Sequence, residues 1–89
     1  MITIHCELTD TSLYPIVDDA FVVSAGMKKI GIGQYEGTGN VINTSFFAIK
    51  DLFKNEDFVK SIKVFTRTVD GEEEDLLEFY EYLKRRGRI

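Results

Sequence analysis

Apolar and polar residues alternate strictly near the start of the chain. Over residues 2–8 (Ile-Thr-Ile-His-Cys-Glu-Leu) every second side chain is apolar. This is the period of a strand with one buried and one solvent-exposed face, so we expect a strand here. Residues 10–15 (Asp-Thr-Ser-Leu-Tyr-Pro) then bring turn formers and the only proline. Because a proline disfavours the helical conformation of the residue before it, we expect a loop.

Two strand-like runs follow, over residues 21–26 (Phe-Val-Val-Ser-Ala-Gly) and 29–35 (Lys-Ile-Gly-Ile-Gly-Gln-Tyr). The glycine between them favours a turn, so together they predict a hairpin. In the second run Ile30 and Ile32 share one face, which predicts an apolar side. Tyr35 lies on the other face among glycines and is therefore a candidate contact residue.

The apolar spacing then changes to that of a helix over about residues 43–54, whose first three polar residues offer an N-cap. Phe46, Ile49 and Phe53 recur at spacings of three and four and predict a stripe that faces the core. Phe47 lies about 100° further round the helix, on the polar side. We therefore interpret Phe47 as the first candidate for contact with a partner.

A strand is predicted over residues 62–69 by their β-branched content, with the Asp-Gly pair at 70–71 ending it. We expect the last helix to begin with the acidic run at 72–75 and to bury an apolar stripe over 76–83. Tyr82 stands outside that stripe among charged residues, which makes it the second candidate contact residue.

These elements predict a single α+β domain over residues 1–89. The expected order is β-β-β-α-β-α, with a small antiparallel sheet of about four strands and two helices packed on one face. With 44% apolar and 29% charged residues, the composition is that of a folded globular chain. A domain of this size buries little surface, so a homodimer is left open.

The composition also bears on location and chemistry. Cys6 is the only cysteine, so no intramolecular disulfide can form, and the chain starts without a signal-peptide pattern. No apolar run approaches the length that spans a bilayer. We therefore expect a cytoplasmic protein without a membrane segment.

No catalytic or metal-binding constellation is visible. His5 and Cys6 are each the only residue of their type, and as neighbours on a strand they point to opposite faces. The glycines between Gly31 and Gly39 match neither a dinucleotide fingerprint nor a phosphate-binding loop. We expect no enzyme activity, no cofactor and no bound metal.

The charges are distributed unevenly. The formal net charge is −4, and residues 1–26 contain acids but neither lysine nor arginine. Acids concentrate again at 72–75, and basic residues at 84–88. Both runs complement the dipole of the expected last helix, which is the simpler interpretation. The basic run can alternatively contact phosphate groups.

We expect a small acidic binding protein whose partner is a protein with a basic surface. Acidic inhibitors, antitoxins, immunity proteins and viral anti-defence proteins are similar to this chain in size and charge alone. The candidate contact residues are Phe47, Tyr82, Tyr35, Asp18, Asp19, Glu72 and Glu73. The alternative is an accessory protein that binds nucleic acid through Lys84, Arg85, Arg86 and Arg88, against which the overall acidity argues. A small enzyme is the least favoured class.

Overall fold

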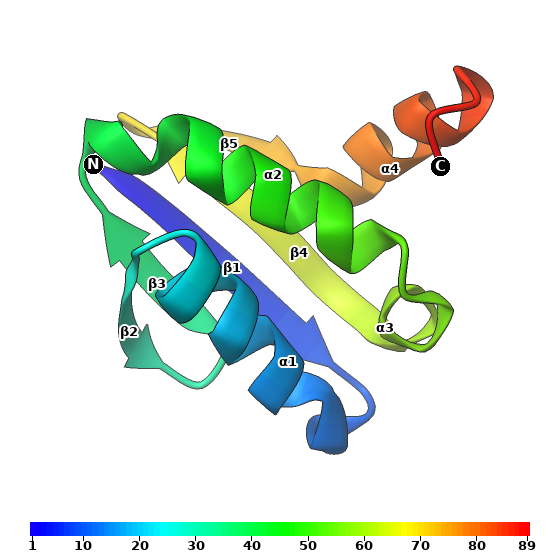
Figure 1. The fold of residues 1–89 in the computed structure, drawn as a ribbon, viewed down its shortest axis with the longest axis horizontal. Coiled ribbons are helices and arrows are strands. Elements are labelled where there is room, and N and C mark those ends of the chain that lie inside the picture. The colour runs from blue at the N-terminus through cyan, green and yellow to red at the C-terminus, as the bar shows by residue number, and fades with distance from the viewer.

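A computed structural model describes all residues of the chain, 1–89. Its centre is a five-stranded, fully antiparallel sheet with strand order β2-β3-β1-β4-β5 (Figure 1). The strands are β1 (Ile2–Leu8), β2 (Lys28–Gly31), β3 (Gln34–Gly37), β4 (Ile62–Val69) and β5 (Glu72–Asp75). The alternating N-terminal run therefore forms the central strand, and the predicted strand over 62–69 is its neighbour.

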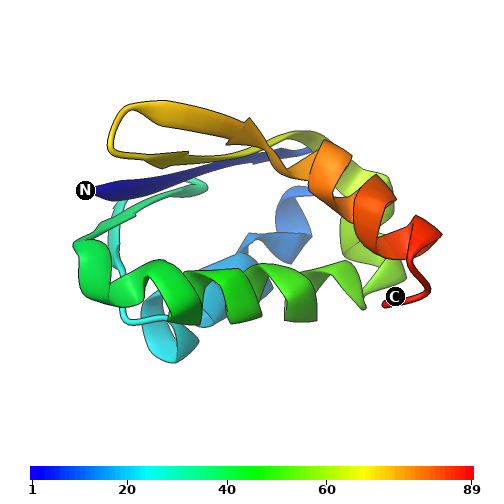
Figure 2. The ribbon, with the colours of Figure 1, turned by 90° about the horizontal axis from the view of Figure 1, so that it is seen from above.

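Four helices accompany the sheet: α1 (Tyr14–Asp18), α2 (Ile42–Phe53), α3 (Glu56–Ser61) and α4 (Leu76–Arg85). Figure 2 shows α1 and α2 below the sheet, with α4 leaving the end of β5 and turning toward the same side. The α+β class with an antiparallel sheet is confirmed. The sequence interpretation was wrong in its detail, since it expected about four strands and two helices.

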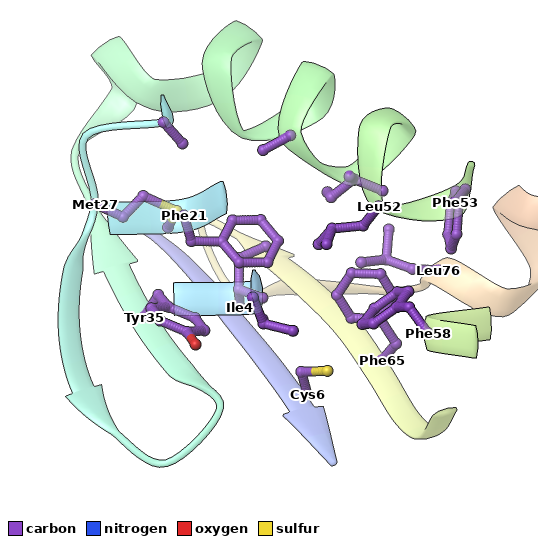
Figure 3. Packing of buried hydrophobic residues seen from close by; sticks show 14 of the residues in the cluster. Ile4, Cys6, Phe21, Met27, Tyr35, Leu52, Phe53, Phe58, Phe65 and Leu76 are labelled. Carbon is purple, nitrogen blue, oxygen red and sulfur yellow. The ribbon is translucent and has the colours of Figure 1, made fainter. Parts of the chain in front are cut away.

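The core fills the space between the sheet and the helices (Figure 3). The alternate residues of β1 that were expected to be buried are buried, including Ile4 and Cys6. Phe65 of β4 lies at the centre, where its ring is within 6.3 Å, centroid to centroid, of the rings of Phe21, Phe53 and Phe58. Each fully buried side chain of this size stabilises the fold by roughly 1.5–3 kcal/mol. The aromatic cluster therefore joins the helices to the sheet.

The segment expected to be a loop and a first hairpin arm is helical instead. A 3₁₀ turn at Thr11–Leu13 leads into α1, which continues as a wider π-type helix to Ser24. Pro15 lies in the first turn of α1, where its missing N–H removes no helical hydrogen bond. Val17 and Phe21, four residues apart, are both fully buried. That helical spacing outweighs the β propensity of the valines that follow.

The hairpin consequently lies further along the chain and is formed by β2 and β3. Gly33 has a φ of +67° in its turn, and a Cβ built there would lie 2.0 Å from the carbonyl oxygen of Cys6, so the close approach of the turn to β1 requires glycine. Ile30 and Ile32 are 48% and 73% exposed. The predicted apolar side is therefore exposed to solvent, because Ile30 belongs to the edge strand β2 and Ile32 lies in the turn that follows it.

The acidic run at 72–75 does not form the first turn of the last helix. It forms β5, the second arm of a hairpin whose turn at Asp70 and Gly71 has φ values of +50° and +88°. The side chain of Asp75 caps α4 by accepting a hydrogen bond from the backbone N–H of Leu77 at 2.9 Å. The tight turn brings residues 72–75 alongside β4, with which they pair in antiparallel register, and this explains why the acids extend the sheet.

Helix α2 agrees with its prediction in position, although its N-cap residue offers no side-chain bond. The hydroxyl of Thr44 instead donates to the carbonyl oxygen of Ala25 at 2.9 Å, which links α2 to the preceding loop. Ile49 and Phe53 are buried as expected, whereas Phe46 is half-buried. No helix has the length and apolar character needed to cross a membrane.

Candidate functional site

One face of the sheet is left uncovered by the helices (Figure 2). Because Ile4 points into the core, its neighbours Thr3 and His5 point to this open face. The strand register extends the face across the sheet by pairing Thr3 with Glu36 and with Thr68. By this register four carboxylates lie on the open face: Glu7, Glu36, Glu73 and Asp75. Lys28 is the only lysine that the register places there. The open face is therefore polar and acidic.

The acidic character continues along the edge of the sheet. Strand β5 pairs only with β4, so its other edge is free, and all four of its residues are acidic and exposed. Glu72 and Glu73, two of the candidate contact residues, lie here side by side on opposite faces of the strand. Glu74 forms an ion pair with Arg67 at 3.2 Å. Glu72 and Glu73 form no ion pair and carry uncompensated charge.

A cleft of about 490 Å³ opens beside this edge, between β4, β5 and the start of α2. Three carboxylates and one guanidinium line it, together with two aliphatic side chains: Asp70, Glu72, Glu74, Arg67, Val69 and Ile42. The Nε of Arg67 is buried without a hydrogen-bond partner. A lysine or arginine side chain of a partner fits this chemistry, since its aliphatic stem can pack on Ile42 and its charged end can reach Glu72.

The two aromatic residues predicted to be exposed are exposed. Phe47 is 60% and Tyr82 45% accessible. The ring centroids of Phe47 and Phe46 are 6.2 Å apart, and those of Phe46 and Phe79 of α4 are 5.2 Å apart. Tyr82 lies one helical turn beyond Phe79. The rings of Phe46, Phe47 and Phe79 thus form a chain of contacts between α2 and α4, and helical spacing places Tyr82 next to Phe79. We call these four residues the aromatic ridge.

Tyr35 is not on the surface. It is fully buried beneath α1, its ring contacts that of Phe21 at 5.1 Å (Figure 3), and its hydroxyl donates a hydrogen bond of 2.5 Å to Asp18. Asp18 also accepts from Lys29 at 2.9 Å. Of this group of candidates, Tyr35 and Asp18 are therefore engaged inside the fold, while Asp19 is exposed beside them.

The surroundings of Tyr35 and Asp18 shift both of their pKa values. Partial burial by itself raises the pKa of the Asp18 carboxyl, but the hydrogen bonds from Tyr35 and Lys29 and the positive charge of Lys29 outweigh it and lower the pKa below 3.8. Burial, followed by the hydrogen bond to Asp18 and the carboxylate charge, raises the pKa of the Tyr35 hydroxyl. The network therefore favours a charged Asp18 and a neutral Tyr35, which is a structural arrangement.

The remaining chemistry-bearing residues form no reactive group. Burial, with a smaller effect of the Glu7 charge, raises the pKa of the Cys6 thiol to about 12, which leaves it unreactive. His5 contacts the carboxylate of Glu7 at 2.8 Å on the open face, as expected from the strand pattern. No group of three or more His, Cys, Asp or Glu side chains is arranged to hold a metal ion.

The four basic candidates at the C-terminus do not act on one surface. Arg86 lies over the ring of Tyr82 at 5.2 Å, and Lys84 lies over that of Tyr80 at 5.8 Å. Lys84 and Arg88 line a groove at the far end of the molecule from the β4–β5 turn, and Arg85 and Arg86 do not.

Comparison of the chain with protein-family models, curated proteins and solved structures found no match.

Sequence reasoning missed Glu36 and Asp70 as parts of the acidic surface. Neighbouring residues of a strand point to opposite faces of the sheet, so a strand over 34–37 with Tyr35 in the core places Glu36 on the open face. The sequence interpretation positioned the hairpin too early in the chain to show this. The cleft lies between α2 and a hairpin that are adjacent only in the folded chain. No local signal in the sequence indicates it.

Proposed function

We propose that this protein is a small non-enzymatic binding module that presents the acidic open face and β5 edge of its sheet to a basic surface of another protein. The observation that carries the proposal is the concentration of uncompensated acids there. Glu36, Glu72 and Glu73 are on these surfaces and form no ion pair, Glu7 lies there beside His5, and Lys28 is the only lysine that the strand register places among them. Such a surface attracts a basic partner and speeds its association.

The aromatic ridge and the cleft supply the contacts that hold the partner once it is bound. Exposed aromatic side chains contribute a large share of the free energy of binding at protein interfaces, so we assign this role to Phe47 and Tyr82. Ile42 lines the cleft and belongs to the same helix as Phe47, so α2 contributes both to the acidic cleft and to the aromatic ridge. Charge then guides the partner, and the ridge determines how long it stays bound.

An inhibitory role follows if the partner's basic surface ordinarily holds an anionic ligand. The acidic face would then occupy a groove that nucleic acid otherwise enters. This proposal corresponds to the inhibitor class of acidic proteins, whose surface competes with a polyanion for the same cations. The alternative, direct binding of nucleic acid, has less support because the acidic face and edge repel phosphates.

The experiment is affinity capture from native lysate with the purified protein, carried out with nuclease and without. We expect a protein to be captured equally in both, and we expect Phe47→Ala and Tyr82→Ala to shorten its retention while the fold is kept. Salt-sensitive binding of arbitrary DNA or RNA that substituting Lys84, Arg85, Arg86 and Arg88 by Gln abolishes would contradict the proposal and support the alternative.

A further inference from the structure

At the other end of the molecule a groove of about 730 Å³ lies between α2, α3 and the C-terminal residues. Figure 1 shows α3 and the chain's end on the side away from the β4–β5 turn. The volume is within the range of about 300–1,000 Å³ that small-molecule sites occupy. The groove is thus separate from the acidic surface and large enough for a ligand.

The charge of the groove is opposite to that of the protein. Four basic side chains and one acidic side chain line it: Lys54, Lys60, Lys84, Arg88 and Glu56. Three elements supply these lysines: Lys54 is the C-cap of α2, and Lys60 and Lys84 lie in the last turns of α3 and α4. Each lysine, taken alone, is explained by its favourable interaction with the dipole of its own helix. Their convergence on one groove creates a positive potential that no single helix requires.

Most of these cations are free to bind an anion. Lys54 contacts Asp51 at 3.5 Å, whereas Lys60, Lys84 and Arg88 take part in none of the ion pairs of the structure. Lysine and arginine are the side chains that bind phosphate groups, lysine as a point charge and arginine through paired N–H groups. A ligand with several negative charges in a small volume suits this arrangement.

The remaining wall of the groove is apolar. Phe53, Val59, Tyr80 and Ile89 form it. Tyr80 is half-buried, and its ring is held against that of Phe53 at a centroid distance of 5.1 Å. A flat or aliphatic group can pack beside Tyr80 while the charged part of the same molecule meets the cations. The site therefore combines an anion pocket with an apolar platform.

We propose that this groove binds a small phosphate-bearing molecule with a flat apolar body, of the nucleotide class. A compact ligand is favoured over an extended polyanion because the chain has a net charge of −4. Charges screen one another beyond about 8 Å at physiological salt. A nucleotide stays within the positive groove, whereas a long strand of nucleic acid extends beyond it along a protein of net negative charge and is repelled.

The test is titration of the ¹⁵N-labelled protein with magnesium-free ATP, followed by NMR, in parallel with AMP, inorganic tripolyphosphate and a single-stranded DNA oligomer. We expect ATP to shift the signals of residues 53–60 and 80–89 and to bind more tightly than either AMP or tripolyphosphate. Equal affinity for ATP and tripolyphosphate would show a charged surface without a platform and overturn the proposal. If the DNA oligomer bound more tightly than ATP, the proposal of a compact ligand would be overturned.

Substitutions identify the groove. Lys60→Gln combined with Arg88→Gln should weaken ATP binding by about tenfold, because two charge-assisted contacts are lost. Lys28→Gln combined with Lys63→Gln removes the same charge from exposed strand positions outside the groove and should leave the affinity nearly unchanged. An equal loss of ATP affinity in the two double variants would contradict a defined site in the groove. Thermal melts of both variants verify that the fold is kept.

Discussion

The buried contact between Tyr35 and Asp18 shows why a candidate chosen by position in a strand can be wrong. The sequence places Tyr35 among glycines, which predicts an exposed aromatic ring on a bare face. The neighbouring segment folds as a helix rather than a strand, and it covers Tyr35 with Phe21. Asp18, expected on the surface as well, accepts the tyrosine's hydrogen bond. The error at these two residues thus comes from the helix at 14–24.

Asp18 gives a pH-dependent prediction. Its folded pKa lies below the ordinary 3.8, so its contribution to stability is present above that value and is lost as pH falls through the folded pKa. Asp18→Asn removes the charge and should lower the free energy of unfolding at neutral pH by about 1 kcal/mol. The difference between the two proteins should vanish in strong acid. Urea titrations over a pH series measure it, and a difference that is independent of pH would contradict the account.

At the level of elements, most of the fold follows from local periodicity. The alternation of residues 2–8 and the β-branched run at 62–69 predict the two central strands, and the spacing of Ile49 and Phe53 predicts α2. The helix at 14–24 was missed because its valines favour strands and its proline was interpreted as a helix breaker. In its first turn a proline is compatible with a helix. The buried pair Val17 and Phe21 was the signal available.

The acidic run changes role with its element, and Asp75 provides the test. Because Asp75 caps α4, Asp75→Ala should lower the free energy of unfolding by about 1 kcal/mol. Glu73 is exposed on β5 and makes no side-chain hydrogen bond, so Glu73→Ala should change it by less than about 0.5 kcal/mol. Chemical denaturation of both variants measures the two effects. Equal losses would indicate that the acids act together as helix-terminal charges, as the sequence alone suggested.

The aromatic ridge allows the effects of replacing exposed and packed aromatic rings to be compared. Phe47→Ala and Tyr82→Ala should change stability by less than about 0.5 kcal/mol, because both residues are exposed and neither belongs to the buried core. Phe46→Ala is the control and should cost about 2 kcal/mol, since its half-buried ring packs on Phe79. Thermal melts distinguish these values. A melting temperature lowered as much by Phe47→Ala as by Phe46→Ala would place Phe47 in the core.

The whole molecule separates its charges along its length. The acids of β5 and the β4–β5 turn lie toward one end, and the cations of the groove lie toward the other (Figure 1). The sequence predicts both runs, since residues 72–75 and 84–88 are visible as blocks. It does not predict that Lys54 and Lys60 join Lys84, or that Glu36 joins Glu73. Those sets come together only when the sheet and helices pack.

The measurement that tests the proposed function most directly is capture of a protein partner by two charge variants of equal net charge. The first carries Glu36→Gln, Glu72→Gln and Glu73→Gln on the acidic surface, and the second carries Asp51→Asn, Asp57→Asn and Glu81→Gln on exposed helix positions. We predict that the first loses the partner that the unmodified protein captures in the presence of nuclease, with a slower association rate, and that the second keeps it. Equal capture by both variants would contradict the acidic surface as the binding site.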